Sequence, residues 1–552
     1  MDASKDFWNT ENLYIEGDNL DVLKVLRENY LGKIKMIYID PPYNTGNDFV
    51  YNDDFAKGKE DFESTSGLFD EDGNQVIDPM QRNTESNGRF HTDWLNMIYP
   101  RLKVARDLLS DDGLIFISLS DKEIKNLRNL CDEIFGEQNL VADLIWANKE
   151  GGGSSDSKLF RIKHEHICCY AKNISNVKII GNPISNEDRY KGSDEYESIR
   201  GKYYLQKLGM GSIQYSVTLD YPITAPDNTL IYPKDNNNGK KACWRWSKEK
   251  FLKNQALGFV EIKPDSSGVW TVYTKQYMNC DNDGNIITRT QRPMGIIEEF
   301  SSTQAAKLLD KMGLGSVFNY AKPIELLYYL ISKLKGKNFI ILDFFSGSAT
   351  TAHAVMKLNA EDGGKRKFIM VQLPEVTDEK SEARKVGYEN ICQIGEERIR
   401  RAGEKVKEEA GDKANDLDVG FRVLKLDSSN MEDVFYTPEY FNVQHVIDFV
   451  DNVKSDRTPL DLLFQVLPEL GIELSTKIEE RDVNGKKVFF VDGTYLIATF
   501  DTEVNESTIT EIAKMKPQYF VMRDASAAND NVLDNFEQIF RHYSPDTIRK
   551  IL

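Results

Sequence analysis

The chain has 552 residues, of which 40% are hydrophobic and 29% charged, and its formal net charge is −18. This composition is typical of a globular protein with several domains and excludes collagen-like and low-complexity chains. No apolar run approaches the ~18–20 residues of a membrane span, and Met1 to Asp6 lack the pattern of a signal peptide, so we expect a cytoplasmic protein without a membrane partner.

The first 175 residues alternate apolar strands with amphipathic helices. Strands are predicted at 12–16, 34–39, 114–119, 141–146 and 167–170, and helices at 20–30, 92–109 and 124–135. Asp18 or Asn19 is suited to cap the first helix. This alternation predicts a doubly wound α/β domain over residues 1–175.

Residues 47–90 interrupt the alternation with a polar stretch rich in Gly, Asp, Asn and Ser. A loop of this length is uncommon in a compact domain unless it covers or binds something. We therefore predict a mobile cover for the turn that precedes it.

That preceding turn, Asp40-Pro41-Pro42-Tyr43, follows the strand 34–39 directly. Neither proline can donate to a sheet ladder, so the chain must leave the sheet there in a stiff turn, at the edge where open α/β sheets bind ligands. The Asp40 carboxylate and the Pro41 carbonyl offer two acceptors to an –NH2 group, and the Tyr43 ring offers a stacking face to its heterocycle. Ordinary turn chemistry is the alternative.

Residues 176–310 lose helical periodicity and are rich in Asn, Gly, Tyr, Ser and Pro. The segment 151–310 holds 22 Lys or Arg against 18 Asp or Glu, so the acidity lies elsewhere and a DNA-contacting face is permitted here. Trp244, Arg245, Trp246 and Lys248 mix aromatic and basic side chains, which suits base stacking and phosphate contact. A tryptophan pair packing a small β-rich core explains them equally well.

The α/β pattern returns over residues 311–410. We predict helices at 323–334 and through Leu358, and strands at 339–345 and 368–373. The small residues Ser346 to Thr351 between a strand and a helix would let a ligand carboxylate approach backbone N–H groups, and S-adenosylmethionine (AdoMet) carries a carboxylate. An ordinary strand-to-helix turn has the same appearance.

Residues 411–552 are predicted to form a separate α+β unit with a helix at 460–470 and a hairpin within 487–500 around Asp492-Gly493. We find no catalytic constellation there and expect subunit or partner contacts. The six cysteines show no metal-type pairing, and His164-Glu165-His166 lacks an apparent third ligand, so we predict no metal site.

Taken together, the motifs resemble those of DNA adenine-N6 methyltransferases in which the catalytic motif precedes the cofactor motif. The chain is most similar to the modification (Mod) subunits of type III restriction–modification systems. The stretches that carry this resemblance are Gly17–Asn19, Ile39–Gly46, Trp94–Leu102, Lys322–Leu327 and Asp343–Ser348.

The resemblance implies a Rossmann-like AdoMet-dependent core in circularly permuted motif order, split by a target-recognition domain at 176–310 and followed by the C-terminal α+β domain. It implies that Asp40, Pro41, Pro42 and Tyr43 hold a flipped adenine. The residues that it assigns to AdoMet are Asp18, Lys322, Pro323, Asp343, Phe345, Ser346, Gly347, Ser348, Thr350 and Gln372.

Two positions depart from the family pattern. Ala349 stands where a glycine is usual, and Gln372 stands where an acid often binds the ribose, with Glu375 three residues further on. The identity of the ribose-binding residue therefore stays open at this point.

We expect an enzyme that methylates N6 of adenine at specific sites in double-stranded DNA, and the resemblance also implies a homodimer. The alternatives are a DNA-recognition subunit acting mainly within a restriction complex, a solitary epigenetic adenine methylase, and methylation of RNA or of cytosine N4. The chain has no G-x4-G-K-[ST] motif, so DNA cleavage would need a restriction (Res) helicase/nuclease partner.

Overall fold

A computed structural model describes residues 3–46, 49–51, 80–84, 86–149, 162–210, 214–234, 241–318, 321–432, 453–527 and 530–552. The described chain divides into two compact units, one formed by the segments up to Ile179 and from Met294 onward, the other by Ile180–Pro293. Most of the predicted cover at 47–90 lies outside the described residues. Its described ends, β3 (Phe49–Tyr51) and β4 (Met80–Arg82), pair antiparallel.

The first unit is built on a nine-stranded sheet of order β17-β6-β7-β5-β2-β18-β19-β1-β20. All neighbours are parallel except β7, which runs antiparallel to both β5 and β6. The strands are β1 (Leu13–Glu16), β2 (Ile34–Ile39), β5 (Leu109–Leu119), β6 (Leu140–Trp146), β7 (Glu165–Ala171), β17 (Ile296–Ile297), β18 (Ile340–Asp343), β19 (Lys367–Gln372) and β20 (Arg422–Lys425).

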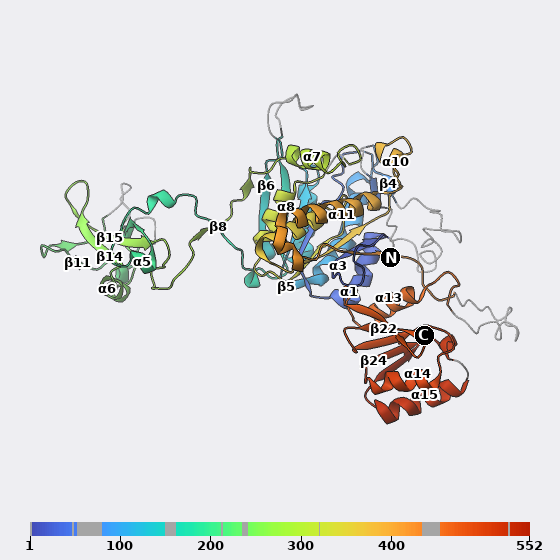
Figure 1. Cartoon of the computed structure of the whole chain (residues 1–552). Helices are drawn as coiled ribbons and strands as arrows, with labels where there is room; N and C mark the ends of the chain where they lie inside the picture. The colour runs from blue at the N-terminus through green and yellow to red at the C-terminus, as the bar shows by residue number, and fades with distance from the viewer. Residues whose placement is uncertain are drawn as a thin grey trace. The chain divides into compact units, whose positions relative to one another are not determined.

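Helices cover both faces of this sheet (Figure 1). One face packs on α1 (Asn19–Tyr30), α3 (Phe90–Leu108) and α4 (Ile124–Phe135); the other packs on α7 (Ser302–Lys311), α8 (Ile324–Ser332), α9 (Thr350–Asp362) and α11 (Ile391–Ala410). In β2, Ile37 and Ile39 join the first core while Met36 and Tyr38 join the second. Burial on both faces explains why the strand is a continuous apolar run rather than an alternating one.

The predicted Rossmann-like architecture is confirmed. β5 begins five residues earlier than the predicted 114–119, because Leu109 pairs with Ile34 across a register shift that the polar Ser110 to Gly113 accommodate. Among the described residues, no helix is long and apolar enough to cross a membrane.

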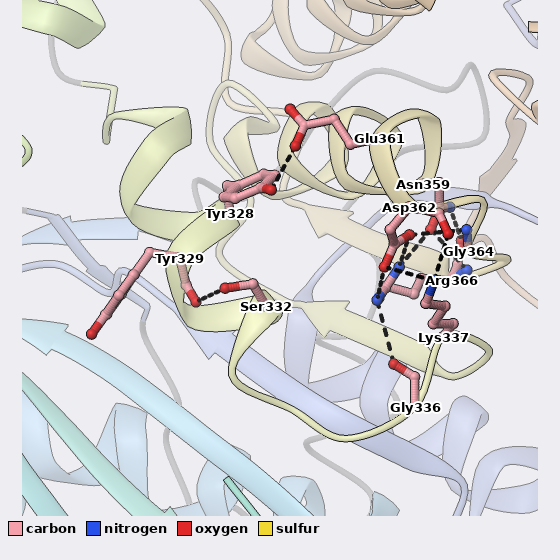
Figure 2. Close-up of polar contacts among 10 residues, drawn as sticks. All are labelled: Tyr328, Tyr329, Ser332, Gly336, Lys337, Asn359, Glu361, Asp362, Gly364 and Arg366. Carbon is pink, nitrogen blue, oxygen red and sulfur yellow. Dashed lines mark hydrogen bonds and ion pairs between the residues drawn. The ribbon is translucent and has the colours of Figure 1, made fainter. Parts of the chain in front are cut away.

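A polar network ties the amino ends of β18 and β19 to α8 and α9 (Figure 2), at the opposite end of β18 from Asp343. Arg366 donates to both carboxylate oxygens of Asp362 at 2.9 and 3.0 Å, and its carbonyl accepts from Asn359 at 2.8 Å. Tyr328 of α8 donates to Glu361 of α9 at 2.6 Å. These contacts fix where α9 ends and β19 starts.

The second unit has its own core of aromatic and aliphatic side chains. Its largest sheet has the order β14-β15-β9, formed by β14 (Val260–Pro264), β15 (Trp270–Tyr277) and β9 (Tyr203–Lys207). Other elements include α5 (Glu197–Arg200), β10 (Gly209–Met210), β11 (Ile223–Thr224), β12 (Leu230–Ile231), β13 (Cys243–Trp244) and α6 (Lys248–Ala256). β8 (Asn182–Pro183) and β16 (Thr290–Gln291) pair antiparallel, so the chain enters and leaves the unit side by side.

This unit is narrower than the predicted segment 176–310. Residues 294–310 belong with the first unit because β17 pairs with β6 and Leu309 of α7 packs in its core. The sequence did not indicate α7, because the Gly- and Asn-rich residues before it gave the whole segment an irregular pattern.

Beyond β20, a five-stranded sheet of order β21-β22-β23-β24-β25 forms an α+β region. It is not the separate unit predicted over 411–552, because β20 joins the nine-stranded sheet and Leu462 and Val466 pack in the core of the first unit. Its elements are α13 (Pro459–Glu469), β21 (Ile478–Val483), β22 (Lys486–Val491), β23 (Leu496–Thr499), α14 (Glu506–Lys514), β24 (Tyr519–Met522), α15 (Asp530–Tyr543) and β25 (Ile548–Ile551). The short helix α10 (Glu382–Lys385) lies earlier in the chain, between β19 and α11. The predicted hairpin is β22–β23, which turns through Asp492 and Gly493, both at positive φ.

Candidate active site

The Asp40 turn leaves β2 as predicted, directly after Ile39. The indole Nε1 of Trp94, on α3, donates to the Pro42 carbonyl at 2.7 Å and fixes the turn. Asn44 adopts a left-handed conformation (φ +57°), and its buried side chain donates to Glu123 at 2.7 Å. The turn is thus held from both sides by buried polar contacts.

Asp343 ends the neighbouring parallel strand β18, in which Leu342 lies opposite Ile37 of β2. Asp40 and Asp343 therefore follow adjacent strands at one edge of the sheet. The Asp343 carboxylate accepts from Thr351 at 2.5 Å and from the backbone N–H of Phe345 at 3.2 Å. Burial raises the pKa of Asp343 to about 7, although both hydrogen bonds oppose the shift.

Four side chains converge beside this edge. The Lys322 ammonium donates to Asp40 Oδ2 at 2.6 Å and to the Tyr43 hydroxyl at 2.9 Å. The Tyr43 hydroxyl donates to Glu165 Oε2 at 2.8 Å, and that oxygen lies 3.6 Å from the Lys322 nitrogen. Two of the predicted catalytic residues, Asp40 and Tyr43, are thus brought into direct contact with Lys322, although they lie about 280 positions from it in the chain.

The charges of this cluster depend on one another. Burial raises the pKa of Asp40, while the nearby Lys322 lowers it and Glu165 raises it further. Burial lowers the pKa of Lys322, but the two carboxylates outweigh it, so the net shift is upward and the side chain stays an ammonium. Asp40 Oδ1 is buried and accepts no hydrogen bond from the described residues. One acceptor of the carboxylate is therefore available to a ligand.

The turn after β18 shows what holds the predicted cofactor residues. Gly347 sits at φ +49°, and its N–H donates to the Gln372 side-chain oxygen at 2.7 Å. Ser346 Oγ is buried without a partner among the described residues. Ala349 takes a left-handed conformation (φ +59°), which explains why a glycine is usual there.

Ser348 and Thr350 have a partner of their own. The fully buried guanidinium of Arg398, on α11, donates to their hydroxyls at 2.6 and 2.7 Å. Burial lowers the pKa of Arg398 to about 9. These two side chains therefore serve the start of α9, and a ligand would meet the backbone of this turn rather than their hydroxyls.

Asp18, predicted as a cap, does cap α1: it accepts from the N–H groups of Leu20 and Asp21 at 2.8 and 3.2 Å. Its second oxygen lies 3.2 Å from the buried Arg101. Asn19 donates to the Phe344 carbonyl at 2.8 Å and joins this turn to the one after β18. Pro323 precedes the first residue of α8 and places Lys322 just outside that helix.

In the second unit, the candidate DNA contacts divide. Trp244 and Trp246 are 3% and 8% exposed and belong to its core, which favours the packing alternative for both rings. Arg245 donates to the Lys207 carbonyl at 2.7 Å, and Lys248 is exposed at the start of α6.

Comparison of the sequence with known proteins matches the chain to one family. A family model described as DNA methylase, of the N6/N4 methyltransferases, matches residues 34–397. The chain belongs to this DNA methylase family. The match includes the Asp40 turn, Lys322 and the turn after β18, and it contains the whole second unit.

Curated relatives of this DNA methylase include Mod subunits of type III restriction–modification enzymes. It is 32% identical to the type III EcoPI Mod subunit of Escherichia phage P1 and 31% identical to the EcoP15I Mod subunit of Escherichia coli, in each case over 91% of this chain and 79% of the relative. Among solved structures, the cytosine-N4-specific PvuII DNA methyltransferase aligns over 76% of this chain and all of that chain, at 13% identity and a TM-score of 0.32. The protein is a DNA methyltransferase of a type III restriction–modification system, and its cofactor is AdoMet.

The described residues fit that cofactor. The buried Asp343 carboxylate suits an ammonium group, and the unpartnered Ser346 hydroxyl beside the start of α9 suits a carboxylate. The side-chain oxygen of Gln372 accepts from the Gly347 N–H, so this side chain reaches the turn after β18 from the neighbouring strand β19.

Sequence analysis missed three residues of the site. Glu165 stands in the His-Glu-His stretch that resembles a metal-binding motif, whereas its carboxylate lies in the candidate site and His166 contacts Asp143 at 3.1 Å. Asn148 donates to Glu165 at 2.6 Å. Arg101 lay in the motif Trp94–Leu102, but nothing in the motif pointed to its buried contact with Asp18.

Proposed function

We propose that the protein is the modification subunit that methylates N6 of adenine in double-stranded DNA. The observation that carries this proposal is the Asp40 carboxylate, held at the sheet edge beside Tyr43 and Asp343 with one buried oxygen free. A carboxylate suits a transition state in which an amine nitrogen gains positive charge, whereas related enzymes that act on other amines tend to carry Asn or Ser at this position.

The target base must leave the helix to reach this site, because N6 lies within the paired stack. Asp40 and the Pro41 carbonyl would then accept the two N–H bonds of the amine, and the Tyr43 ring would stack on the base. When bound, AdoMet supplies the electrophilic methyl group. The residues that would hold it are Asp343, Phe345 to Gly347 and, at the turn joined to them through Asn19, Asp18.

Methylation forms a nitrogen–carbon bond while the donor's sulfur–carbon bond breaks, and the amine must then lose one proton. We assign Asp40 Oδ1 as the acceptor of this proton. Burial raises the pKa of Asp40 and makes it a better base than an exposed carboxylate.

The family contains N4 as well as N6 methyltransferases, so the modified base is the first thing to measure. The chain and its D40A variant should be expressed in a methylation-deficient host, and the nucleosides of the host DNA analysed by mass spectrometry. We expect N6-methyladenine from the wild type only; N4-methylcytosine would overturn the assignment of the base, and no methylated base would overturn the proposal. Single-molecule sequencing of the same DNA maps the recognition site.

We further propose that Ile180–Pro293 reads the DNA sequence. The unit has a separate core and exposes cations such as Lys248, while Trp244 and Trp246 stabilise it from within. The DNA-binding role of Arg245 would require its guanidinium to leave the Lys207 carbonyl.

Restriction would require a partner with a helicase and nuclease, as the type III names of the relatives suggest. We propose a Res subunit as this partner and a homodimer as the modification enzyme, acting on DNA in the cytoplasm. Quantitative methylation by the purified chain alone would show that catalysis does not need the partner, and light scattering would test the dimer.

A further inference from the structure

Lys322 neutralises the carboxylate that the target amine is proposed to bind, since it holds Asp40 Oδ2 while Oδ1 stays open to the amine. Its ammonium donates to Asp40 Oδ2 at 2.6 Å and to the Tyr43 hydroxyl at 2.9 Å, and its side chain is only 12% exposed. An ammonium and an exocyclic amine both present N–H donors to a carboxylate. The protein thus supplies its own amine to the Asp40 carboxylate when no base is present.

Glu165 offers this ammonium a second place. Its Oε2 lies 3.6 Å from the Lys322 nitrogen and accepts from Tyr43, while its Oε1 accepts from Asn148. β7 carries Glu165 and runs antiparallel to β5, so the carboxylate comes from outside the parallel strands that supply Asp40 and Asp343. Two anchors fix Glu165, and neither of them is Lys322.

We propose that Lys322 is a gate and Glu165 its positioning residue: the amine that binds at Oδ1 competes with the Lys322 ammonium on Oδ2 for the charge of one carboxylate, and the ammonium shifts to Glu165. The inference rests on the proposed function, in which Asp40 grips the target amine. A movement of about one ångström suffices, because the nitrogen already lies within ion-pair distance of both carboxylates. The ammonium is never left buried without a partner, which is the costly alternative.

Glu165 has a second effect through Tyr43. The hydrogen bond from the Tyr43 hydroxyl fixes the plane of the ring against which the base would stack. If Glu165 had only a structural role, its loss would disturb the orientation of the Tyr43 ring and nothing else. The gate adds a specific consequence: loss of Glu165 strengthens the hold of Lys322 on Asp40, and removal of the ammonium relieves it.

The first test compares E165Q, K322M and the double variant E165Q/K322M by transfer of labelled methyl from AdoMet to DNA. We expect E165Q to lower kcat by about tenfold or more, and the double variant to recover at least about threefold over E165Q. The matched control is E361Q, since Glu361 also accepts from a tyrosine hydroxyl, at 2.6 Å (Figure 2), but lies in the last turn of α9, whereas the candidate site adjoins the start of that helix. It should retain wild-type kcat.

The second test needs no turnover. DNA containing the mapped site is compared with the same DNA carrying purine, which lacks the 6-amino group, in place of the target adenine. The preference for adenine over purine in binding should rise by roughly threefold or more in K322M and fall in E165Q, because Lys322 no longer competes in the first and competes more in the second.

An unchanged adenine-over-purine ratio in K322M would overturn the gate even if the double variant were inactive. If the kcat of the double variant were no higher than that of E165Q, and its adenine-over-purine binding ratio equalled that of E165Q, Glu165 would have only a structural role. Absence of methylation by the wild type would instead overturn the proposed function, so the two failures are distinguishable.

Discussion

At the scale of single residues, the site depends on two carboxyl groups whose ionised form is disfavoured by burial. Asp40 and Asp343 follow adjacent strands, and the pKa of each is raised by burial. Asp40 is balanced by the Lys322 ammonium, whereas Asp343 relies on two hydrogen bonds. Each carboxylate is therefore prepared for a ligand that brings N–H donors or positive charge.

Asp40→Ala removes an acceptor that faces charge developing only in the transition state. We expect kcat to fall by about 10²–10³-fold while DNA binding survives, measured by methyl transfer and by gel shift. E361Q is the control, since Glu361 lies in the last turn of α9, outside the candidate site and outside the unit proposed to read DNA. Normal methylation by D40A would contradict the mechanism.

Asp343→Asn tests the ammonium site through its pH dependence. Because the pKa of Asp343 is about 7 in the folded protein, its carboxylate is fully formed only above that pH, so AdoMet affinity should rise between about pH 6 and about pH 7.5. The D343N variant should bind weakly and without this dependence in calorimetry. An equally steep pH profile in D343N would assign the dependence to another group.

The same raised pKa has a consequence for stability without ligand. The unfolded chain ionises near pH 3.8 and the folded chain near pH 7, so the folded state loses stability as pH rises through this interval and the loss is complete above it. Asp343→Asn should remove this decline in the midpoint of urea unfolding. A decline that persists in the variant would mean that other buried acids cause it.

At the scale of elements, the start of α9 is the feature that most depends on distant sequence. Ala349 enters the helix from a left-handed conformation, and the hydroxyls of Ser348 and Thr350 meet a buried arginine from α11. The turn is thus shaped by its partner helix as much as by its own small residues.

Arg398→Ala should destabilise the protein because two buried hydroxyls lose their donor, at about 1–3 kcal/mol for each group left unpaired. Arg398→Lys keeps the charge but not the fork of donors, so we expect only partial recovery. Urea unfolding gives the comparison, with R541A as control: Arg541 is 71% exposed and its ion pair with Glu537 is worth about 0.3–0.5 kcal/mol. Equal effects of R398A and R541A would refute this account.

At the scale of the whole molecule, the second unit is a module inserted between two halves of the core. The β8–β16 pair closes its entry and exit, and its own hydrophobic cluster is formed by described residues between positions 196 and 280. The two halves of the core nevertheless share one sheet, since β2 and β18 are neighbours. We therefore expect the halves to assemble without the module.

Replacing Ile180–Pro293 with a short glycine linker should leave AdoMet binding intact and abolish DNA binding and methylation. Calorimetry measures the first and a gel shift the second. The full-length D40A variant is the matched control, because it should bind DNA without methylating it. Site-specific DNA binding by the shortened chain would place recognition outside this unit.

The sequence alone determined the parallel α/β core and the Asp40 turn, because apolar runs and paired prolines act locally and leave few alternatives. The turn at 346–351, the cap at Asp18 and the hairpin at Asp492-Gly493 were predictable for the same reason. Tertiary structure decided that Glu165 enters the site while its histidine neighbours do not, that Trp244 and Trp246 lie in a core, and that residues 294–310 return to the sheet. It also decided that Lys322 rests on Asp40, since a contact between residues about 280 positions apart depends on the order of strands in the sheet, which no local pattern records.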